Sequence, residues 1–248
     1  MDKEQVWLQK RLGMITASEL GNITSASGKI IDGNIDYIRS KRFERNHGFS
    51  LPVSSRAMEL GKQNEPMAIE WYRANYPKPE IIYAQDLPEI PFWTNPLVPD
   101  FGASPDAFTE DETTVVEVKC VIGNSSIEFY FGPATSFEEK KARVAKEHLD
   151  QILGQFIANP NVQFIRLLKY CPQNDDILQD LDSPLEPWRG IVFEFERKDY
   201  EASIQEMIER IDLFNAFIAC GANPSTFKVG EWHIDGDRLL QTIPEKKK

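Results

Sequence analysis

A short run of β-branched residues in the middle of the chain constrains the fold most. Residues 115–120, VVEVKC, combine three valines with one glutamate and one lysine, and β-branched residues favour strands. Side chains two apart on a strand share a face, so Glu117 and Lys119 should project in the same direction. Burying a carboxylate and an ammonium costs free energy unless they serve a purpose. We therefore expect a strand with a polar site on one face.

The residues before this strand supply a second carboxylate. Asp106 follows a Ser-Pro turn, and ten residues, including the polar turn TEDE at 109–112, separate it from Glu117. A hairpin-like return over these residues would bring Asp106 alongside Glu117. Two converging carboxylates with a lysine beside them suit a hard divalent cation and a water nucleophile. A surface hairpin with an ordinary Glu–Lys pair explains the same residues, so both interpretations stay open on local grounds.

The N-terminal quarter contains a candidate anion site. Thr16 and Glu19 form a capping-box pattern in MITASEL, which predicts a helix that begins at Thr16. A helix N-terminus offers unpaired N–H groups and the positive end of a dipole, and both favour an anion. Ser18 would add a hydroxyl, and Arg11 could hold a phosphate through two N–H groups. A plain helix cap with a solvent-facing arginine is the alternative.

Hydrophobic periodicity in the rest of the chain predicts further helices and strands. Amphipathic helices are expected where apolar residues recur at three- and four-residue steps, and strands where short apolar runs occur. The expected helices cover 54–76, 138–158 and 199–220, and the expected strands cover 80–87, 163–170 and 190–196. Pro66 should kink or restart the first helix just after Glu65, and Gln151 lies on a polar stripe of the second. This order predicts an α/β fold with a central mixed sheet flanked by helices.

Length and composition are those of a globular chain with a single sizeable core. The 248 residues are 41% hydrophobic, and no uncharged apolar run approaches 18 residues, so we expect no membrane span and a cytoplasmic protein. The three cysteines lack metal-ligand spacing, which predicts buried thiols in a reducing compartment. We interpret the chain as one domain over 1–248, with a core at about 5–220 and a C-terminal tail at 221–248.

The net charge of −11 opposes binding to a polyanion, but the charge is unevenly distributed. Residues 1–62 carry ten Lys/Arg and seven Asp/Glu, a net charge of +3, whereas residues 63–248 carry eighteen and thirty-two, a net charge of −14. A nucleic-acid contact should therefore draw on the N-terminal quarter. Some of the acidic excess could be metal ligands, whose charge a bound cation would invert locally.

Five segments together resemble one known family. They are WLQKRLGMITASEL, GKQNEPMA, GASPDAF, VEVKC and HLDQILGQF, and they occur in this order over roughly residues 5–220. Their order and spacing resemble the phage lambda-type exonucleases, which are viral recombination nucleases of the PD-(D/E)xK, restriction-endonuclease-like superfamily. The resemblance implies the restriction-endonuclease-like α/β core of that superfamily.

The resemblance also implies the roles of individual residues. Glu65, Asp106 and Glu117 match ligands of Mg²⁺, helped by the backbone carbonyl of Val118, and Mn²⁺ is expected to substitute. Lys119 matches the lysine that orients the attacking water and stabilises charge on the transition state. The positions that grip a terminal 5′ phosphate correspond here to Arg11, Ser18, Ser104 and Gln151.

The implied activity is a Mg²⁺-dependent 5′→3′ exonuclease. It would degrade double-stranded DNA from 5′-phosphorylated ends and leave 3′ overhangs for phage recombination in the bacterial host cell. A single-strand annealing protein is the expected partner, and the family resemblance also implies a homotrimeric ring. The alternatives are an endonuclease or single-strand DNA nuclease on the same fold, which would gain nothing from a terminal-phosphate pocket, and a non-catalytic DNA-end-binding module, which has no need of clustered carboxylates that repel DNA.

The chain departs from the family pattern at a few positions. Ala107 follows the Ser-Pro-Asp motif where Gly is usual, and Val121 replaces the usual Pro after the cysteine of the strand. Trp93 and the aromatic residues 129–131, expected in a loop, could stack on unpaired bases or pack in the core. Met58 lies before the helix glutamate, where relatives place an apolar residue near the strand-splitting point, so a wedge role is a hypothesis.

Overall fold

The central sheet is built around the valine-rich run. In the computed structural model, which describes residues 2–24, 32–50, 55–172, 183–221, 232–235 and 238–241, this run forms β5 (Thr114–Cys120). Most of β5 is buried because it lies at the centre of a five-stranded sheet with the order β2-β4-β5-β6-β7. β5 is parallel to β6 and antiparallel to β4. The sheet is therefore mixed, as the sequence predicts.

The strands on the two sides of β5 differ in length. β6 (Phe164–Tyr170) and β7 (Gly190–Glu196) are long, whereas β2 (Ile82–Tyr83) and β4 (Ala107–Phe108) have two residues each. β4 pairs with β5 only at Val115 and Val116, so the described strands leave the β4 side of β5 open beyond Val116. This open edge is where the candidate site forms.

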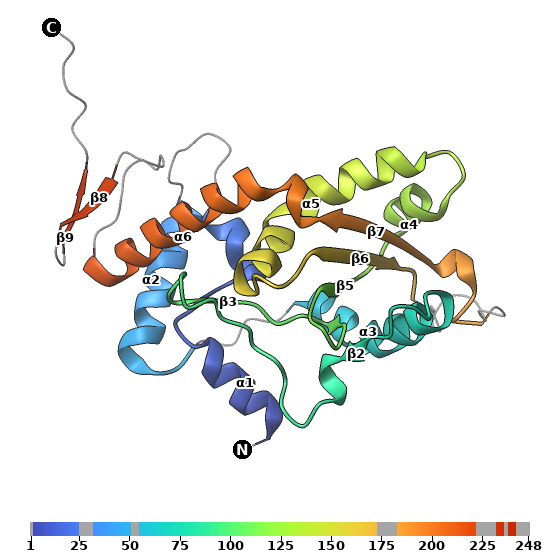
Figure 1. Ribbon diagram of the computed structural model, residues 1–248, viewed down its shortest axis with the longest axis horizontal. Helices are drawn as coiled ribbons and strands as arrows, with labels where there is room; N and C mark the ends of the chain where they lie inside the picture. The colour runs from blue at the N-terminus through green and yellow to red at the C-terminus, as the bar shows by residue number, and fades with distance from the viewer. Residues whose placement is uncertain are drawn as a thin grey trace, which may run out of the picture.

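Helices cover both faces of the sheet (Figure 1). Their bounds are Lys3–Arg11 (α1), Asp32–His47 (α2), Arg56–Asn75 (α3), Asn124–Phe131 (α4), Phe137–Ala158 (α5) and Glu201–Cys220 (α6). On one face, Val115 and Leu167 pack in a hydrophobic cluster that includes residues of α5 and α6. On the other face, Val116 and Val118 pack in a second cluster with residues of α3. Because side chains alternate along a strand, Glu117 projects toward the α5 side.

A smaller pair of strands brings two distant motifs together. β1 (Ile15–Thr16) lies parallel to β3 (Phe101–Gly102), with Thr16 opposite Gly102. The chain leaves the same end of both strands, toward Ser18 on one side and Ser104 on the other. The capping-box segment and the Ser-Pro-Asp turn are therefore neighbours, although more than eighty residues separate them.

Short elements complete the described chain. They are the 3₁₀ turns η1 (Ala17–Asn22), η2 (Ala84–Asp86), η3 (Pro187–Arg189) and η4 (Arg197–Asp199), and the hairpin of β8 (Trp232–Asp235) and β9 (Arg238–Gln241), which contacts α6. No helix among the described residues has the length and apolar character needed to cross a membrane.

Several local expectations are wrong. The segment after Cys120 is not a loop with exposed aromatics, because it forms α4, in which Tyr130 is buried and Phe129 and Phe131 pack against the core. The prediction that these rings stack on bases loses its support. Cys220 is exposed rather than buried.

The helix predicted over 54–76 is present as α3, which runs through Pro66 without a restart. The kink predicted as the alternative at Pro66 stays a prediction. The helix expected at Thr16 is only the six-residue 3₁₀ turn η1, which ends at Gly21 and Asn22, two poor helix formers. The described residues at Thr16 therefore lack the dipole of a full α-helix, and binding of an anion at this position would depend on side chains.

Candidate active site

Asp106 and Val118 are joined across the open edge of β5. The Val118 N–H donates to Asp106 Oδ2 at 2.7 Å, in the stretch of β5 that β4 leaves uncovered. The N–H and C=O of one strand residue point to the same side, so the Val118 carbonyl also faces this edge. The hairpin predicted between Asp106 and Glu117 is present, and it brings a carboxylate and a main-chain carbonyl together.

Glu117 is a buried carboxylate with three side-chain donors. The residue is 3% exposed, and its Oε1 accepts from Lys119 Nζ at 2.9 Å and from the Gln151 amide. Gln155 Nε2 donates to Glu117 Oε2 at 3.1 Å. Both glutamines lie on α5. These contacts compensate for the desolvation of the buried Glu117 charge.

Glu65 comes to the same place from α3. Tyr83 at the end of β2 donates its hydroxyl to Glu65 Oε1 at 3.1 Å. Burial raises the pKa of the Glu65 carboxyl, the Tyr83 hydrogen bond lowers it, and the charge of Glu117 raises it further. Glu65 and Glu117 are therefore close enough for the charge of one to affect the other, although they lie on different elements, α3 and β5.

The charged groups of the site shift one another's pKa. Burial raises the pKa of Asp106 well above its usual range, and the nearby carboxylates of Glu117 and Glu65 raise it further. Burial lowers the pKa of Lys119, but Glu117 and Asp106 outweigh it and raise that pKa above the ordinary value. Lys119 is therefore an ammonium at neutral pH, which suits a donor or a charge stabiliser and not a general base.

The oxygen atoms around Glu117 match a divalent cation in kind but not in their present arrangement. Among the described residues, no three His, Cys, Asp or Glu side chains could hold a metal ion together as they stand. In kind, however, the set fits, since hard divalent cations prefer carboxylate and carbonyl oxygens. A cation would also relieve the repulsion that raises the pKa of Asp106 and Glu65. The ligand roles of Glu65, Asp106, Glu117 and Val118 stay predictions.

Arg11, Thr16 and Ser18 form a second polar group at the end of β1. An Arg11 terminal nitrogen lies 3.4 Å from Thr16 Oγ1, and this hydroxyl lies 3.3 Å from Ser18 Oγ. Glu19 accepts from the Thr16 N–H and hydroxyl, at 3.2 and 2.9 Å, so the capping-box contacts are present. The structure thus brings Arg11 and Ser18 together, and the phosphate that they are predicted to bind stays a prediction.

Ser104 connects the two groups. Its Oγ accepts from the indole N–H of Trp7 at 2.6 Å, and the guanidinium of Arg11 lies over the Trp7 ring, 4.2 Å from its centroid. The main-chain carbonyl of Ser104 accepts from Gln155 Nε2 at 3.1 Å. Ser104 is therefore tied to the Arg11 group through its side chain and to Glu117 through Gln155.

Gln151 and Gln155 both contact Glu117 from α5. The Gln151 amide donates to Glu117, and the predicted contact of Gln151 with the phosphate stays a prediction. Gln155, which the prediction omitted, is 1% exposed and joins Ser104 to Glu117. Both of its N–H groups face acceptors, and its Oε1 has no hydrogen-bond partner among the described residues. A buried amide oxygen without a partner costs free energy, so this position is an energetic exception within the site.

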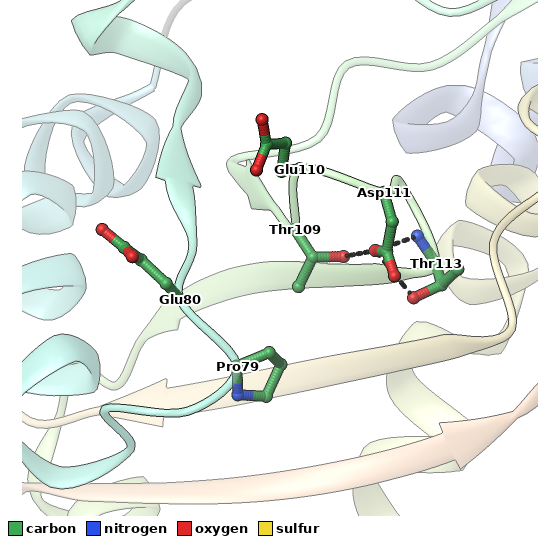
Figure 2. A pocket seen from close by; sticks show the side chains of 6 residues that line it. All are labelled: Pro79, Glu80, Thr109, Glu110, Asp111 and Thr113. Atoms are coloured by element: carbon green, nitrogen blue, oxygen red, sulfur yellow. Dashed lines mark hydrogen bonds between the residues drawn. The ribbon is translucent and has the colours of Figure 1, made fainter.

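The remaining predicted contacts lie outside this group. Met58 is 58% exposed near the start of α3, which is compatible with a wedge and does not test it. Trp93 packs edge-to-face on Phe108 at 5.2 Å, in the core. Figure 2 shows an open hollow at the β4–β5 turn, and the residues that line it are Pro79, Glu80, Thr109, Glu110, Asp111 and Thr113. It contains none of the predicted site residues, because it lies at the other end of β5 from Lys119.

Comparison with families of known proteins gives one match. Residues 6–157 match the YqaJ-like viral recombinase domain, which is more than half of the chain and includes every predicted site residue. None of the curated proteins matches the sequence.

Solved structures show the same fold. An alkaline exonuclease from Laribacter hongkongensis is 21% identical, with a TM-score of 0.60, over 86% of this chain and 92% of that chain. A structure of that exonuclease in complex with dAMP gives a TM-score of 0.58 at 22% identity, over 86% and 94% of the chains. A phage-related exonuclease from Haemophilus somnus gives 0.56 at 14% identity, over 81% and 92%. The expected restriction-endonuclease-like α/β fold is confirmed.

Proposed function

The chain belongs to the family of YqaJ-like viral recombinase domains, and on that premise we propose that it is a nuclease that removes nucleotides from the 5′ ends of double-stranded DNA. One observation carries the proposal: a carboxylate–lysine group and an Arg–Ser group lie side by side, joined through Ser104 and Gln155. The first group suits hydrolysis of a phosphodiester. The second suits a terminal phosphate.

We propose Mg²⁺ as the cofactor, with Mn²⁺ as a substitute. Glu65, Asp106, Glu117 and the Val118 carbonyl would hold it. The chemistry that the cation supplies when bound is a lowered pKa for a water nucleophile and neutralisation of charge on the phosphate. The donor set supports this choice, because it consists of oxygen atoms.

Lys119 acts beside these carboxylates as a charged donor. Its ammonium lies 2.9 Å from Glu117, and the surrounding carboxylates raise its pKa, against the effect of burial. It can donate to the attacking water or to a phosphate oxygen in the transition state, where the negative charge increases. Gln151 and Gln155 hold the Glu117 carboxylate in position. These residues therefore orient and stabilise, and none of them needs to give up a proton.

The Arg11 group determines where the bond is cut. Arg11, Ser18 and Ser104 would bind the 5′ phosphate, and the bonded path from Ser104 to Glu117 keeps this pocket at a set distance from the carboxylates. An enzyme of this geometry releases a 5′ mononucleotide and leaves a 3′ overhang. The exonuclease from Laribacter hongkongensis was solved with dAMP, a deoxynucleoside monophosphate of the kind expected as product.

The biological setting follows from the viral recombinase family. We propose that the 3′ overhangs pass to a single-strand annealing protein, in the cytoplasm of a bacterial host cell. A homotrimeric ring around the DNA would explain processive digestion and belongs to the same proposal. An endonuclease or single-strand DNA nuclease is the second candidate, because the carboxylate group alone would serve either one.

A digestion experiment separates these candidates. Linear duplexes with 5′-phosphate or 5′-hydroxyl ends, closed circles and single strands are incubated with Mg²⁺ or EDTA. We expect Mg²⁺-dependent loss from 5′-phosphorylated linear ends, with circles intact. Lys119→Ala should lower the rate at least about 100-fold, since a preorganised charge stabiliser is worth that much, while DNA binding persists. Cutting of circles would favour the endonuclease, and absence of any cleavage would leave an end-binding module.

A further inference from the structure

Trp7 contacts two residues of the proposed phosphate pocket at once. Its ring lies under the Arg11 guanidinium, 4.2 Å from centroid to carbon, and its indole N–H donates to Ser104 Oγ at 2.6 Å. Trp7 and Arg11 are four residues apart on α1, so they share a face of that helix. Ser104 lies ninety-seven residues further along the chain. One side chain therefore fixes the relative position of two pocket residues from different segments.

The other side-chain contacts that α1 makes with the rest of the protein are weak. α1 has no buried residue. Its described side-chain contacts with the body include Lys10 with Glu89, Glu4 with Lys62, and Lys3 with the Gln85 carbonyl, all of them exposed. Exposed ion pairs contribute little to stability. The half-buried Trp7 links α1 to Ser104, and Arg11 at the end of the same helix reaches Thr16.

The hydrogen bond from Trp7 also sets the polarity of Ser104. A serine hydroxyl has one proton and two acceptor lone pairs, and an indole N–H can only donate. Because Ser104 Oγ accepts from Trp7, its own proton remains free to donate to an anion. The Trp7 ring also holds Arg11, since a guanidinium over an aromatic ring gains a cation–π attraction. The N–H groups of a guanidinium lie in its own plane, where phosphate oxygens can bind two of them at once.

The path continues from Ser104 to the catalytic strand. Gln155 Nε2 donates to the Ser104 carbonyl and to Glu117 Oε2, both at 3.1 Å. Through Gln155, the position of Ser104 that Trp7 helps to fix is also fixed relative to Glu117, the carboxylate that would hold the cation.

We propose that Trp7 is a positioning residue, which holds Arg11 by stacking and orients the Ser104 hydroxyl, and so sets the preference for a 5′ phosphate. This inference rests on the proposed function. It concerns the pocket alone, so its failure leaves the nuclease chemistry intact.

Two substitutions separate the two contacts of Trp7. Trp7→Phe keeps an aromatic face for Arg11 and removes the N–H, whereas Trp7→Leu removes both. The measured quantity is the ratio of kcat/KM for 5′-phosphate over 5′-hydroxyl duplexes. We expect a fall of about fivefold for Trp7→Phe, the size of one lost hydrogen bond, and a further fall of about fivefold for Trp7→Leu. Leu8→Ala, an exposed neighbour on α1, is the matched control and should leave the ratio unchanged.

A double-mutant cycle tests whether Trp7 acts through Ser104. In a Ser104→Ala background, Trp7→Phe should have no further effect on the ratio, because the acceptor of the indole N–H is gone. Additive effects, or an unchanged ratio in both Trp7 variants, would overturn the inference while the proposed nuclease stands. A wild-type enzyme that cuts DNA without preferring 5′-phosphorylated ends would overturn the pocket and the role of Trp7 together. Loss of cleavage with Lys119→Ala reports separately on the catalytic group.

Discussion

At the residue scale, His148 shows how a half-buried polar group is kept neutral. It lies one helical turn before Gln151, and its Nε2 is 2.6 Å from Lys169 Nζ. Lys169 also lies 3.5 Å from Glu147. Burial, with the charges of Lys169 and Lys119, lowers the pKa of His148 to about 3. The neutral ring then accepts a hydrogen bond from the ammonium of Lys169, so His148 serves this contact.

This pKa predicts a loss of stability in mild acid. Below about pH 6.5 the unfolded chain protonates His148 while the folded chain does not. The free energy of unfolding should therefore fall as the pH drops from about 6.5 toward 3, by about 1 kcal/mol per pH unit from this residue. His148→Gln keeps an acceptor for Lys169 and removes the titration. Denaturant unfolding at pH 7 and pH 5 should show a smaller acid loss in the variant. An equal loss in both proteins would contradict the assignment.

Residue-scale prediction from the sequence worked where partners are near in the chain. Asp106, Glu117 and Lys119 belong to one hairpin, so their spacing was sufficient to bring them together. Trp7 and Gln155 were missed, because their contacts with Ser104 and Glu117 depend on packing between distant elements. Gln155 did leave a signal, since it lies four residues from Gln151 on the same polar stripe of α5. Nothing local distinguishes the indole N–H of Trp7 from that of a core tryptophan.

At the element scale, Gly154 lets α5 approach η1 closely. A Cβ built at Gly154 would lie 2.5 Å from Ala17 Cβ and 2.7 Å from Ala17 Cα. Real Cβ atoms do not come so near to a backbone, so a side chain at this position must push η1 away. η1 carries Ser18, and α5 carries Gln155. The close approach of these two elements therefore keeps the two polar groups of the site together.

Gly154→Ala should separate these elements. Alanine gains up to about 1 kcal/mol in helix propensity, but overpacking costs about 1–3 kcal/mol, so we expect a net loss of about 1 kcal/mol in the free energy of unfolding. Gly61→Ala in α3 is the matched control, because its added Cβ meets nothing within 4 Å, and this variant should be neutral or more stable. Denaturant unfolding measures both. If the Gly154→Ala protein were as stable as Gly61→Ala, η1 would be able to move away from α5 without a loss in the free energy of unfolding.

Hydrophobic periodicity correctly predicted each element whose residues follow a single clear pattern. The valine run gave β5, and the apolar stripes of 138–158 and 199–220 gave α5 and α6 within a residue or two. α4 was missed because its aromatic residues follow a Gly-containing segment, which suggested a loop, and tertiary packing of Tyr130 decides the helix instead. The prediction of a strand over 80–87 overreached, because only Ile82 and Tyr83 pair with β4.

At the scale of the whole molecule, the site opposes the stability of the fold. A chain with a net charge of −11 gathers three carboxylates at one edge of its sheet. Burial and mutual repulsion raise the pKa of Asp106 and of Glu65, so the folded state resists the ionised forms. The same charge that destabilises the fold and repels DNA would attract a divalent cation. Cation binding should therefore stabilise the whole protein and not the site alone.

Thermal unfolding with and without Mg²⁺ tests this coupling. A ligand that binds only the folded state raises stability in proportion to the logarithm of its concentration, so Mg²⁺ should raise the Tm of the wild-type protein. Asp106→Asn keeps an acceptor for the Val118 N–H and removes one negative charge. We expect it to unfold a few degrees higher than wild type in EDTA, as relief of active-site strain commonly does, and to gain little from Mg²⁺. Asp36→Asn, an exposed surface change, should respond to Mg²⁺ like wild type. If Asp106→Asn were less stable in EDTA and kept the full Mg²⁺ response, Asp106 would be neither a source of repulsion nor a ligand.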